Sequence, residues 1–112
     1  MRRSGRVLIG TPASSGVYEG PARVLLSPRD HDGVRHGDVV VVRSSSPAWT
    51  PALVKAGALV AELGGVISHT AIVARELGVP CVVGVSGATR EIRNGVGVLV
   101  DGGKGEIRFD RE

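Results

Sequence analysis

The chain alternates between short continuous apolar runs and polar turns rich in glycine, proline and aspartate. The central apolar runs lie at residues 38–43, 58–61 and 81–83. They are too short for helices, and their β-branched and small side chains are typical of strands buried on both faces of a sheet. Apolar segments nearer the two ends predict flanking strands at residues 7–10, 19–26, 96–100 and 106–109, the last two forming a hairpin around a loop at 101–105.

Helix signals lie between and after the central runs. Thr50 can cap a helix over residues 50–57, and Gly57 suits the position just beyond its last turn. A second helix is expected over residues 69–77. A turn or short helix is expected over residues 88–92.

The remaining segments are rich in turn formers. Residues 11–16 are predicted to form a glycine-rich turn, and residues 27–37 a polar surface loop. Because helices occur in the middle and hairpin-like strands flank them, the pattern predicts an α/β fold, a layered β/β/α domain with mixed sheets and two to three short helices. We expect one domain over residues 7–109, preceded by a basic flexible arm at 1–6 and followed by a tail at 110–112.

The net charge of +3 comes from the predicted arm, which holds Arg2, Arg3 and Arg6. Without these three of the 14 basic residues, 11 basic residues remain against 11 acidic ones. No basic stripe is interleaved with aromatic residues, as a single-strand-binding surface would require. Nucleic-acid binding through the arm is therefore a disfavoured hypothesis, and we expect no nucleic-acid partner.

Cysteine usage and apolar run lengths exclude other classes. The single Cys81 rules out an internal disulfide and is expected to be a small buried strand residue. No zinc-like Cys/His spacing occurs, so no metal site is predicted. No apolar run approaches the roughly 18–20 residues of a membrane span, and no secretion signal is recognisable, so a cytoplasmic protein without a membrane partner is expected.

The candidate chemistry lies at the start of the second predicted helix. Ser68 is a natural N-cap, which places His69 in the first helical position beside free N–H groups and the positive end of the helix dipole. A cationic ring is disfavoured there, so we expect a neutral imidazole with a nucleophilic lone pair. Gly64 and Gly65 permit close approach of a large group, and Thr70 can supply a second hydroxyl.

Two interpretations of this histidine follow from its immediate neighbours. One is a residue that merely helps to cap a helix after a glycine-rich bend, and for the hexapeptide alone this is the favoured interpretation. The other is a nucleophile that accepts a phosphoryl group, because the same N–H groups would stabilise the resulting dianionic phosphohistidine.

The wider sequence favours the second interpretation. Residues 64–84, GGVISHTAIVARELGVPCVVG, resemble the signature of the swivelling phosphohistidine domain, the mobile domain of PEP-utilising enzymes. That family includes phosphoenolpyruvate synthase, pyruvate phosphate dikinase, enzyme I and the rifampicin phosphotransferases. Further similar segments, in the family's order, lie at residues 10–24, 47–53 and 100–107. Dikinases and enzyme I typically carry threonine where this chain has Ile67, so the resemblance is nearer to the synthases and antibiotic phosphotransferases.

The resemblance implies a role for each residue of the motif. His69 would carry a phosphoryl group between two active sites as the domain rotates. Gly64, Gly65, Ser68 and Thr70 would lie beside the phosphate.

The chain lacks what a complete catalytic cycle requires. It has no Walker-type loop, no carboxylate cluster for Mg²⁺ and no basic constellation around His69. We therefore expect a phosphotransferase component that is incomplete alone and binds no cofactor itself. Mg²⁺ with ATP or PEP would be bound by a partner in trans, an ATP-grasp nucleotide-binding domain, a PEP/pyruvate-binding domain, or both. The alternative is a catalytically silent, stand-alone interaction or regulatory module with the same fold.

Overall fold

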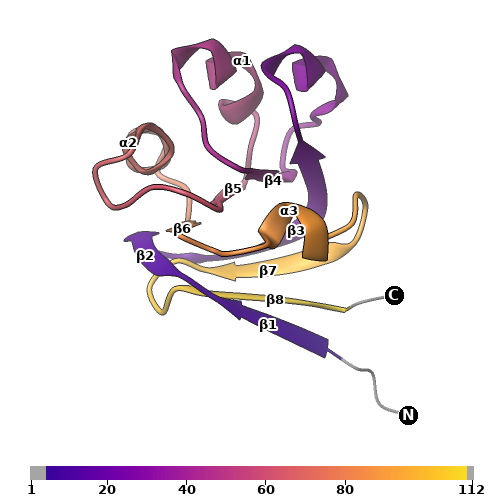
Figure 1. The fold of residues 1–112 in the computed structure, drawn as a ribbon, viewed down its shortest axis with the longest axis vertical. Coiled ribbons are helices and arrows are strands. Elements are labelled where there is room, and N and C mark those ends of the chain that lie inside the picture. The colour runs from indigo at the N-terminus through magenta and orange to yellow at the C-terminus, as the bar shows by residue number, and fades with distance from the viewer. Residues whose placement is uncertain (1–4, 111–112) are drawn as a thin grey trace.

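The computed structural model describes residues 5–110, which form two sheets and an outer layer of helices (Figure 1). The strands are β1 (Gly5–Ile9), β2 (Thr11–Ser14), β3 (Val17–Leu25), β4 (Val39–Val42), β5 (Ala58–Ala61), β6 (Cys81–Val83), β7 (Gly97–Asp101) and β8 (Glu106–Asp110). The α-helices are α1 (Thr50–Leu53), α2 (His69–Leu77) and α3 (Ala88–Glu91), and the 3-10 helices are η1 (Pro28–Gly33) and η2 (Pro47–Trp49). None of the helices within residues 5–110 is long and apolar enough to span a membrane.

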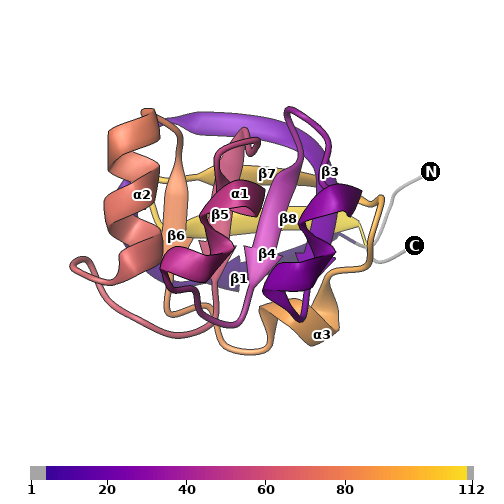
Figure 2. The same cartoon turned by 90° about the horizontal axis from the view of Figure 1, so that it is seen from above.

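Strand β3 joins the two sheets because its two halves have different partners. The strand order is β1-β8-β7-β3-β4-β5-β6-β2. The first half of β3 pairs antiparallel with β7, from Val17 opposite Asp101 to Pro21 opposite Gly97. The second half pairs parallel with β4, from Ala22 opposite Val39 to Leu25 opposite Val42. The sheets pack face to face and α1 and α2 cover the parallel sheet (Figures 1 and 2), so the expected β/β/α layering with mixed sheets is confirmed.

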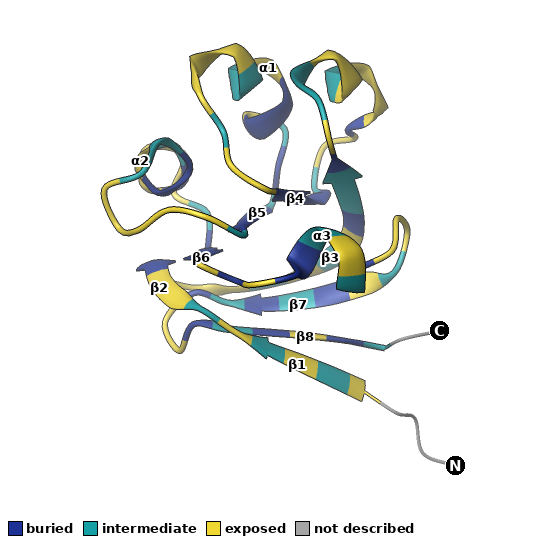
Figure 3. Cartoon of the chain, viewed as in Figure 1, coloured by how far each residue is buried: buried dark blue, intermediate teal, exposed yellow. Residues whose placement is uncertain are grey.

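The continuous apolar runs of the parallel strands face two separate cores. Alternate residues of a strand point to opposite faces. Val39 and Val41 therefore lie between the two sheets, whereas Val40 and Val42 pack beneath the helices. Strands β4 and β5 are dark blue in Figure 3, and all four valines of β4 are fully buried.

Gly10 connects two edge strands that belong to different sheets. It is the single residue between β1, which pairs with β8, and β2, which pairs with β6 at the opposite edge. A Cβ atom on Gly10 would lie 2.5 Å from the carbonyl oxygen of Val83. Only glycine lets the backbone pass this close to β6.

The first residues differ from the sequence-based expectation. The predicted turn at residues 11–16 is largely strand β2, whose Pro12 is tolerated because β2 lies at the sheet edge. The predicted arm at 1–6 is too long, because Gly5 and Arg6 belong to β1, where Arg6 pairs with Glu91 at 3.2 Å.

The boundaries of the predicted domain shift accordingly. Asp110 is the last residue of β8, not part of the predicted tail at 110–112. Residues 1–4 of the predicted arm and 111–112 of that tail lie outside the described residues.

Two further expectations near the helices are corrected. The predicted loop at 27–37 contains η1, which Ser27 caps by accepting a hydrogen bond from the Arg29 N–H at 3.2 Å. The predicted helix at 50–57 is shorter in the structure, where it is α1. Because α1 continues from η2, Thr50 is helical and does not cap. Gly57 does not end a helix; a Cβ there would lie 2.3 Å from the ring of Tyr18.

Candidate active site at the start of α2

The candidate site lies where the chain leaves the carboxyl ends of β4 and β5 and enters α2 (Figure 2). Ligands of α/β folds commonly bind at this edge of a parallel sheet. Gly64 has a φ of +101°, and a Cβ there would lie 2.8 Å from the Cβ of Ser68. Glycine therefore allows the turn to fold tightly against the helix start.

Helix α2 has the boundaries that the sequence predicts, His69 to Leu77. Ser68 adopts extended backbone angles, and its hydroxyl accepts a hydrogen bond from the Ala71 N–H at 3.4 Å. Gly78 ends the helix in the left-handed conformation, with a φ of 74°. These local interactions place His69 in the first helical position, as expected.

The hydroxyl of Ser45 links the imidazole of His69 to the hydroxyl of Thr70. The Oγ of Ser45 lies 2.8 Å from Nδ1 of His69 and 2.6 Å from Oγ1 of Thr70. The His69 side chain is half-buried, and its Nε2 makes no hydrogen bond to any residue in the range 5–110. The geometry thus engages one ring nitrogen and leaves the other without a protein partner.

Sequence reasoning missed Ser45, which lies 24 residues before His69. The available signal was its place in the run Ser44-Ser45-Ser46, one residue after the end of the buried strand β4. Small polar residues at the carboxyl end of a buried parallel strand are candidates for a site. Nothing in the local sequence, however, indicates which of the three would reach the histidine.

The predicted phosphate-side residues occupy different positions. Ser68 and Gly64 pack against each other in the turn before α2. Gly65 is exposed, and a Cβ added there would have no neighbouring atom within 4 Å. Thr70 is only 2% exposed, and its hydroxyl contacts Ser45. The structure therefore assigns the Thr70 hydroxyl to the support of Ser45 and not to the surface beside the ring.

Arg75 fixes the loop that precedes the histidine. One terminal nitrogen of its guanidinium donates to the carbonyl of Ala13 at 2.8 Å, and the other donates to the carbonyl of Val66 at 2.6 Å. The residue therefore ties the loop to β2.

Charged residues from three segments meet beside the site. The carboxylate of Glu62, directly after β5, accepts hydrogen bonds from the backbone N–H and the hydroxyl of Thr89. The hydroxyl hydrogen bond is the largest cause that holds the pKa of Glu62 below its ordinary value, and Arg90 and Arg43 contribute further. Both arginines lie with Ser44 along one cleft, so the structure brings cations near the site that the sequence pattern did not reveal.

The remaining candidate chemistry is buried. Cys81 is fully buried, which confirms the expected small strand residue, and burial raises the pKa of its thiol to about 12. Within residues 5–110, no group of three or more His, Cys, Asp or Glu residues could hold a metal ion.

Comparisons with known proteins identify the family. A family model described as PEP-utilising enzyme, mobile domain, matches residues 34–105, which is more than half of the chain. The chain belongs to this mobile-domain family. The matched span of the mobile domain contains the complete Ser45–His69–Thr70 network and both arginines of the cleft.

Individual relatives agree with the family match. Rifampicin phosphotransferase of Bacillus subtilis (strain 168) is 45% identical over 102 residues, covering 91% of the mobile domain chain and 12% of that protein. A probable phosphoenolpyruvate synthase of Staphylothermus marinus is 42% identical over 105 residues, covering 91% of this chain and 13% of that protein. The mobile domain chain thus spans only 12–13% of the length of these curated relatives.

A solved structure shows the same fold. The solution structure of an Enzyme I protein, nEIt, superposes with a TM-score of 0.62 at 32% sequence identity. The similarity covers 71% of the mobile domain chain and 33% of the Enzyme I chain.

Proposed function

We propose that this mobile domain is a phosphoryl carrier in which Nε2 of His69 accepts a phosphoryl group and passes it on. The observation that carries the proposal is the hydrogen bond between Nδ1 of His69 and Ser45, at the first residue of a helix. It engages Nδ1 and leaves Nε2 as the nitrogen available for attack. The family match and the phosphotransferase relatives support this chemistry.

The network accommodates the reactive tautomer. In the nucleophilic form, Nδ1–H of His69 donates to the Ser45 oxygen, and the Ser45 hydroxyl donates to Oγ1 of Thr70. Nε2 then holds a lone pair. This arrangement needs Ser45 to accept and to donate at once, which a hydroxyl group can do and a methyl group cannot.

The transfer step is a displacement at phosphorus. The lone pair of Nε2 forms the N–P bond, while the bond between phosphorus and the leaving oxygen breaks and the leaving group keeps that electron pair. The ring retains its Nδ1 proton, and the Ser45 oxygen stabilises the positive charge that develops on the imidazole. N–H groups of the first turn of α2 stabilise the phosphoryl oxygens. In the second transfer the acceptor attacks phosphorus and the N–P bond breaks with its electrons returning to Nε2.

The donor and acceptor sites belong to partner domains in this proposal. Phosphoryl transfer requires neutralisation of charge on the transferring group, usually by Mg²⁺ and several cations. An ATP-grasp domain, a PEP/pyruvate-binding domain, or both, would supply Mg²⁺ with ATP or PEP. The chain's small share of its relatives' length leaves ample room for such domains there.

A small donor tests the carrier function without any partner. Phosphoramidate transfers phosphate to exposed histidines, and the adduct can be located by mass spectrometry and by ¹⁵N-edited NMR of the imidazole. We expect one acid-labile phosphate on Nε2 of His69, formed faster than on the exposed His36, and its loss in His69→Ala. The matched control His36→Ala should keep the adduct.

Two outcomes would contradict the proposal. One is labelling of His69 no faster than labelling of His36, which would indicate an ordinary solvated histidine. The other is a phosphate on Nδ1, because that nitrogen is engaged by Ser45. If His69→Ala also keeps full biological activity, the interaction or regulatory module becomes the better description.

A further inference from the structure

A cleft beside the candidate site extends across the carboxyl ends of β3, β4 and β5. Its volume is about 520 Å³, and its lining includes Leu26, Arg43, Ser44 and Arg90. Ser44 is the immediate neighbour of Ser45, the residue that holds His69. The segment that lines the cleft at Ser44 therefore continues directly into the residue that contacts the histidine.

The cleft is cationic and has an apolar wall. Arg43 and Arg90 are exposed, and within residues 5–110 neither guanidinium forms a hydrogen bond or a close ion pair. The nearby carboxylate of Glu62 is occupied by Thr89, so two positive charges face one negative charge. Leu26, which is 79% exposed, forms part of the apolar wall.

A second group of exposed apolar residues lies in the loop between β5 and α2. Leu63, Val66 and Ile67 are exposed, and Ile67, two residues before His69, is 83% exposed. The loop is held firmly, because Arg75 bonds the carbonyl of Val66 and the Leu63 N–H donates to the carbonyl of Arg43 at 2.9 Å. This last hydrogen bond joins the loop to the cleft.

We infer that the cleft and the loop form one docking surface, comprising Leu26, Arg43, Leu63, Val66, Ile67 and Arg90, for the protein domain that phosphorylates His69. This inference rests on the proposed function. The chemistry of the surface identifies the occupant, a domain face with acidic side chains set among apolar ones. The acidic groups would pair with Arg43 and Arg90, while apolar groups cover Leu26 and Ile67.

A protein occupant fits these observations better than a small anion. A phosphate or carboxylate would use the two guanidinium groups, but it would leave Leu26 and the apolar loop exposed. Exposed apolar residues that a rigid backbone holds in place are typical of protein interfaces, because little conformational entropy is lost on binding. Opposite charges across such a surface accelerate the encounter and make it dependent on salt.

The experiment compares two phosphoryl donors acting on the same variants. The protein donor is B. subtilis rifampicin phosphotransferase from which the segment matching this chain has been removed, supplied with ATP in one arm and with PEP in another. The small donor is phosphoramidate. The variants are Arg43→Gln with Arg90→Gln, and Ile67→Ser. The controls are Arg35→Gln, in the loop before β4, and Val17→Ser, an exposed apolar residue in the half of β3 that pairs with β7.

We expect the variants to respond differently to the two donors. With the protein donor, the double arginine variant should be labelled about tenfold more slowly at low salt and lose most of the salt dependence, and Ile67→Ser should be slower by a similar factor. With phosphoramidate, all variants should stay within about twofold of the wild type. The controls should match the wild type with both donors, and thermal unfolding should show every variant folded.

Each other outcome counts against the docking surface. If the arginine variant slows both donors equally, the cleft acts on the reacting anion itself and is no docking surface. The protein donor could label the wild type and the variants at the same rate, or label none of them, while phosphoramidate still labels His69. In that case the docking inference is wrong and the carrier function stands. If phosphoramidate fails, the carrier function has failed first.

Discussion

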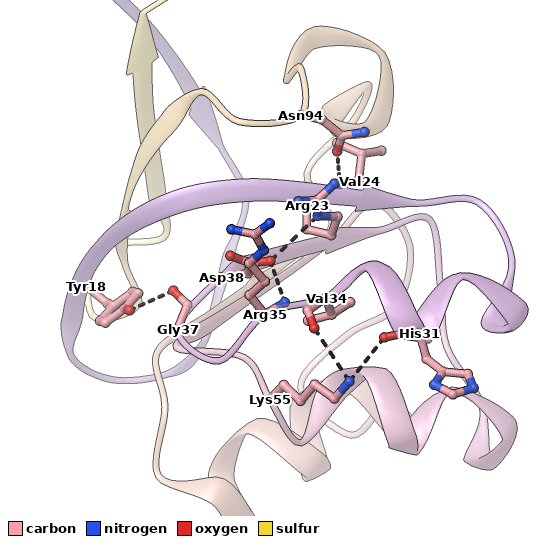
Figure 4. Close-up of polar contacts among 10 residues, drawn as sticks. All are labelled: Tyr18, Arg23, Val24, His31, Val34, Arg35, Gly37, Asp38, Lys55 and Asn94. Atoms are coloured by element: carbon pink, nitrogen blue, oxygen red, sulfur yellow. Dashed lines mark hydrogen bonds and ion pairs between the residues drawn. The ribbon is translucent and has the colours of Figure 1, made fainter.

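The two ends of the same parallel strands carry polar networks of opposite character. At the amino end, Figure 4 shows Asp38, Tyr18 and Lys55 pointing into the loop that precedes β4. At the carboxyl end, Ser45 contacts both the ring of His69 and the hydroxyl of Thr70. Both networks join segments that are distant in the sequence, but they end on different groups.

The amino-end network closes on the backbone. The Tyr18 hydroxyl donates to the carbonyl of Gly37 at 2.7 Å, and Nζ of Lys55 donates to the carbonyls of His31 and Val34 at 3.3 and 3.5 Å (Figure 4). Asp38 accepts the N–H of Arg35 at 2.9 Å. These bonds satisfy carbonyl and N–H groups of an irregular loop, which is a structural task.

The carboxyl-end network ends on a side chain that has a second, unengaged nitrogen. Its members bond to each other and not to the main chain, and the last of them is the imidazole, whose Nε2 has no partner within residues 5–110. A network that closes on backbone stabilises a loop, whereas one that ends at an unpartnered nucleophile orients a reactive group.

Asp38→Ala should affect stability most. The carboxylate is buried, accepts the Arg35 N–H, and lies 3.6 Å from Nε of Arg23, a nitrogen with no other polar partner within residues 5–110. We expect the free energy of unfolding in urea to fall by about 2–3 kcal/mol. Phosphoramidate labelling of His69 in the folded protein should not change. A loss of labelling at equal folded fraction would show that the two ends are coupled.

Gly57→Ala and Gly65→Ala form a matched pair of glycine substitutions. The Gly57 variant places a methyl group against the ring of Tyr18, which should cost about 1–3 kcal/mol of unfolding free energy. Gly65 has open space around it, so its variant should stay within about 0.5 kcal/mol of the wild type. Equal losses at both positions would remove the steric explanation for Gly57.

Ser45→Ala should change the rate of transfer more than stability. Without the hydroxyl the ring loses the acceptor for Nδ1–H, and we expect labelling of His69 about tenfold slower, equivalent to one hydrogen bond of roughly 1.4 kcal/mol. Ser45→Thr should restore most of the rate because it keeps the hydroxyl. The neighbouring Ser46→Ala is the control. If it slows labelling as much as Ser45→Ala does, the orienting role of Ser45 is disproved.

Glu62→Gln should produce the smallest effect, and one that depends on pH. Since the Thr89 hydroxyl holds the pKa of Glu62 below its ordinary value, the carboxylate stabilises the fold above the unfolded-state pKa, and this contribution is lost as the pH falls through the folded-state pKa. The variant should be less stable at pH 7 by no more than about 1 kcal/mol. Urea unfolding should show that gap narrowing in acid; a gap that widens would contradict the assignment.

Much of the fold follows from local patterns in the sequence. The strand over residues 58–61, the strand over 81–83 and the helix over 69–77 are found at the predicted residues, because burial on both faces and helix capping leave strong local signals. The predicted turn at 11–16 is wrong because Pro12 and Gly16 are ordinary turn formers. Only the pairing of β2 with β6 makes residues 11–14 a strand.

The sequence alone was sufficient to place His69 at a helix start and to indicate the resemblance of the chain to the mobile domain, because both depend on neighbouring residues. The tertiary structure decided which ring nitrogen is engaged, through Ser45, and which cations lie nearby, Arg43 and Arg90. These contacts join residues separated by a strand or more of sequence. Sheet order brings such residues together, and no local pattern encodes that order.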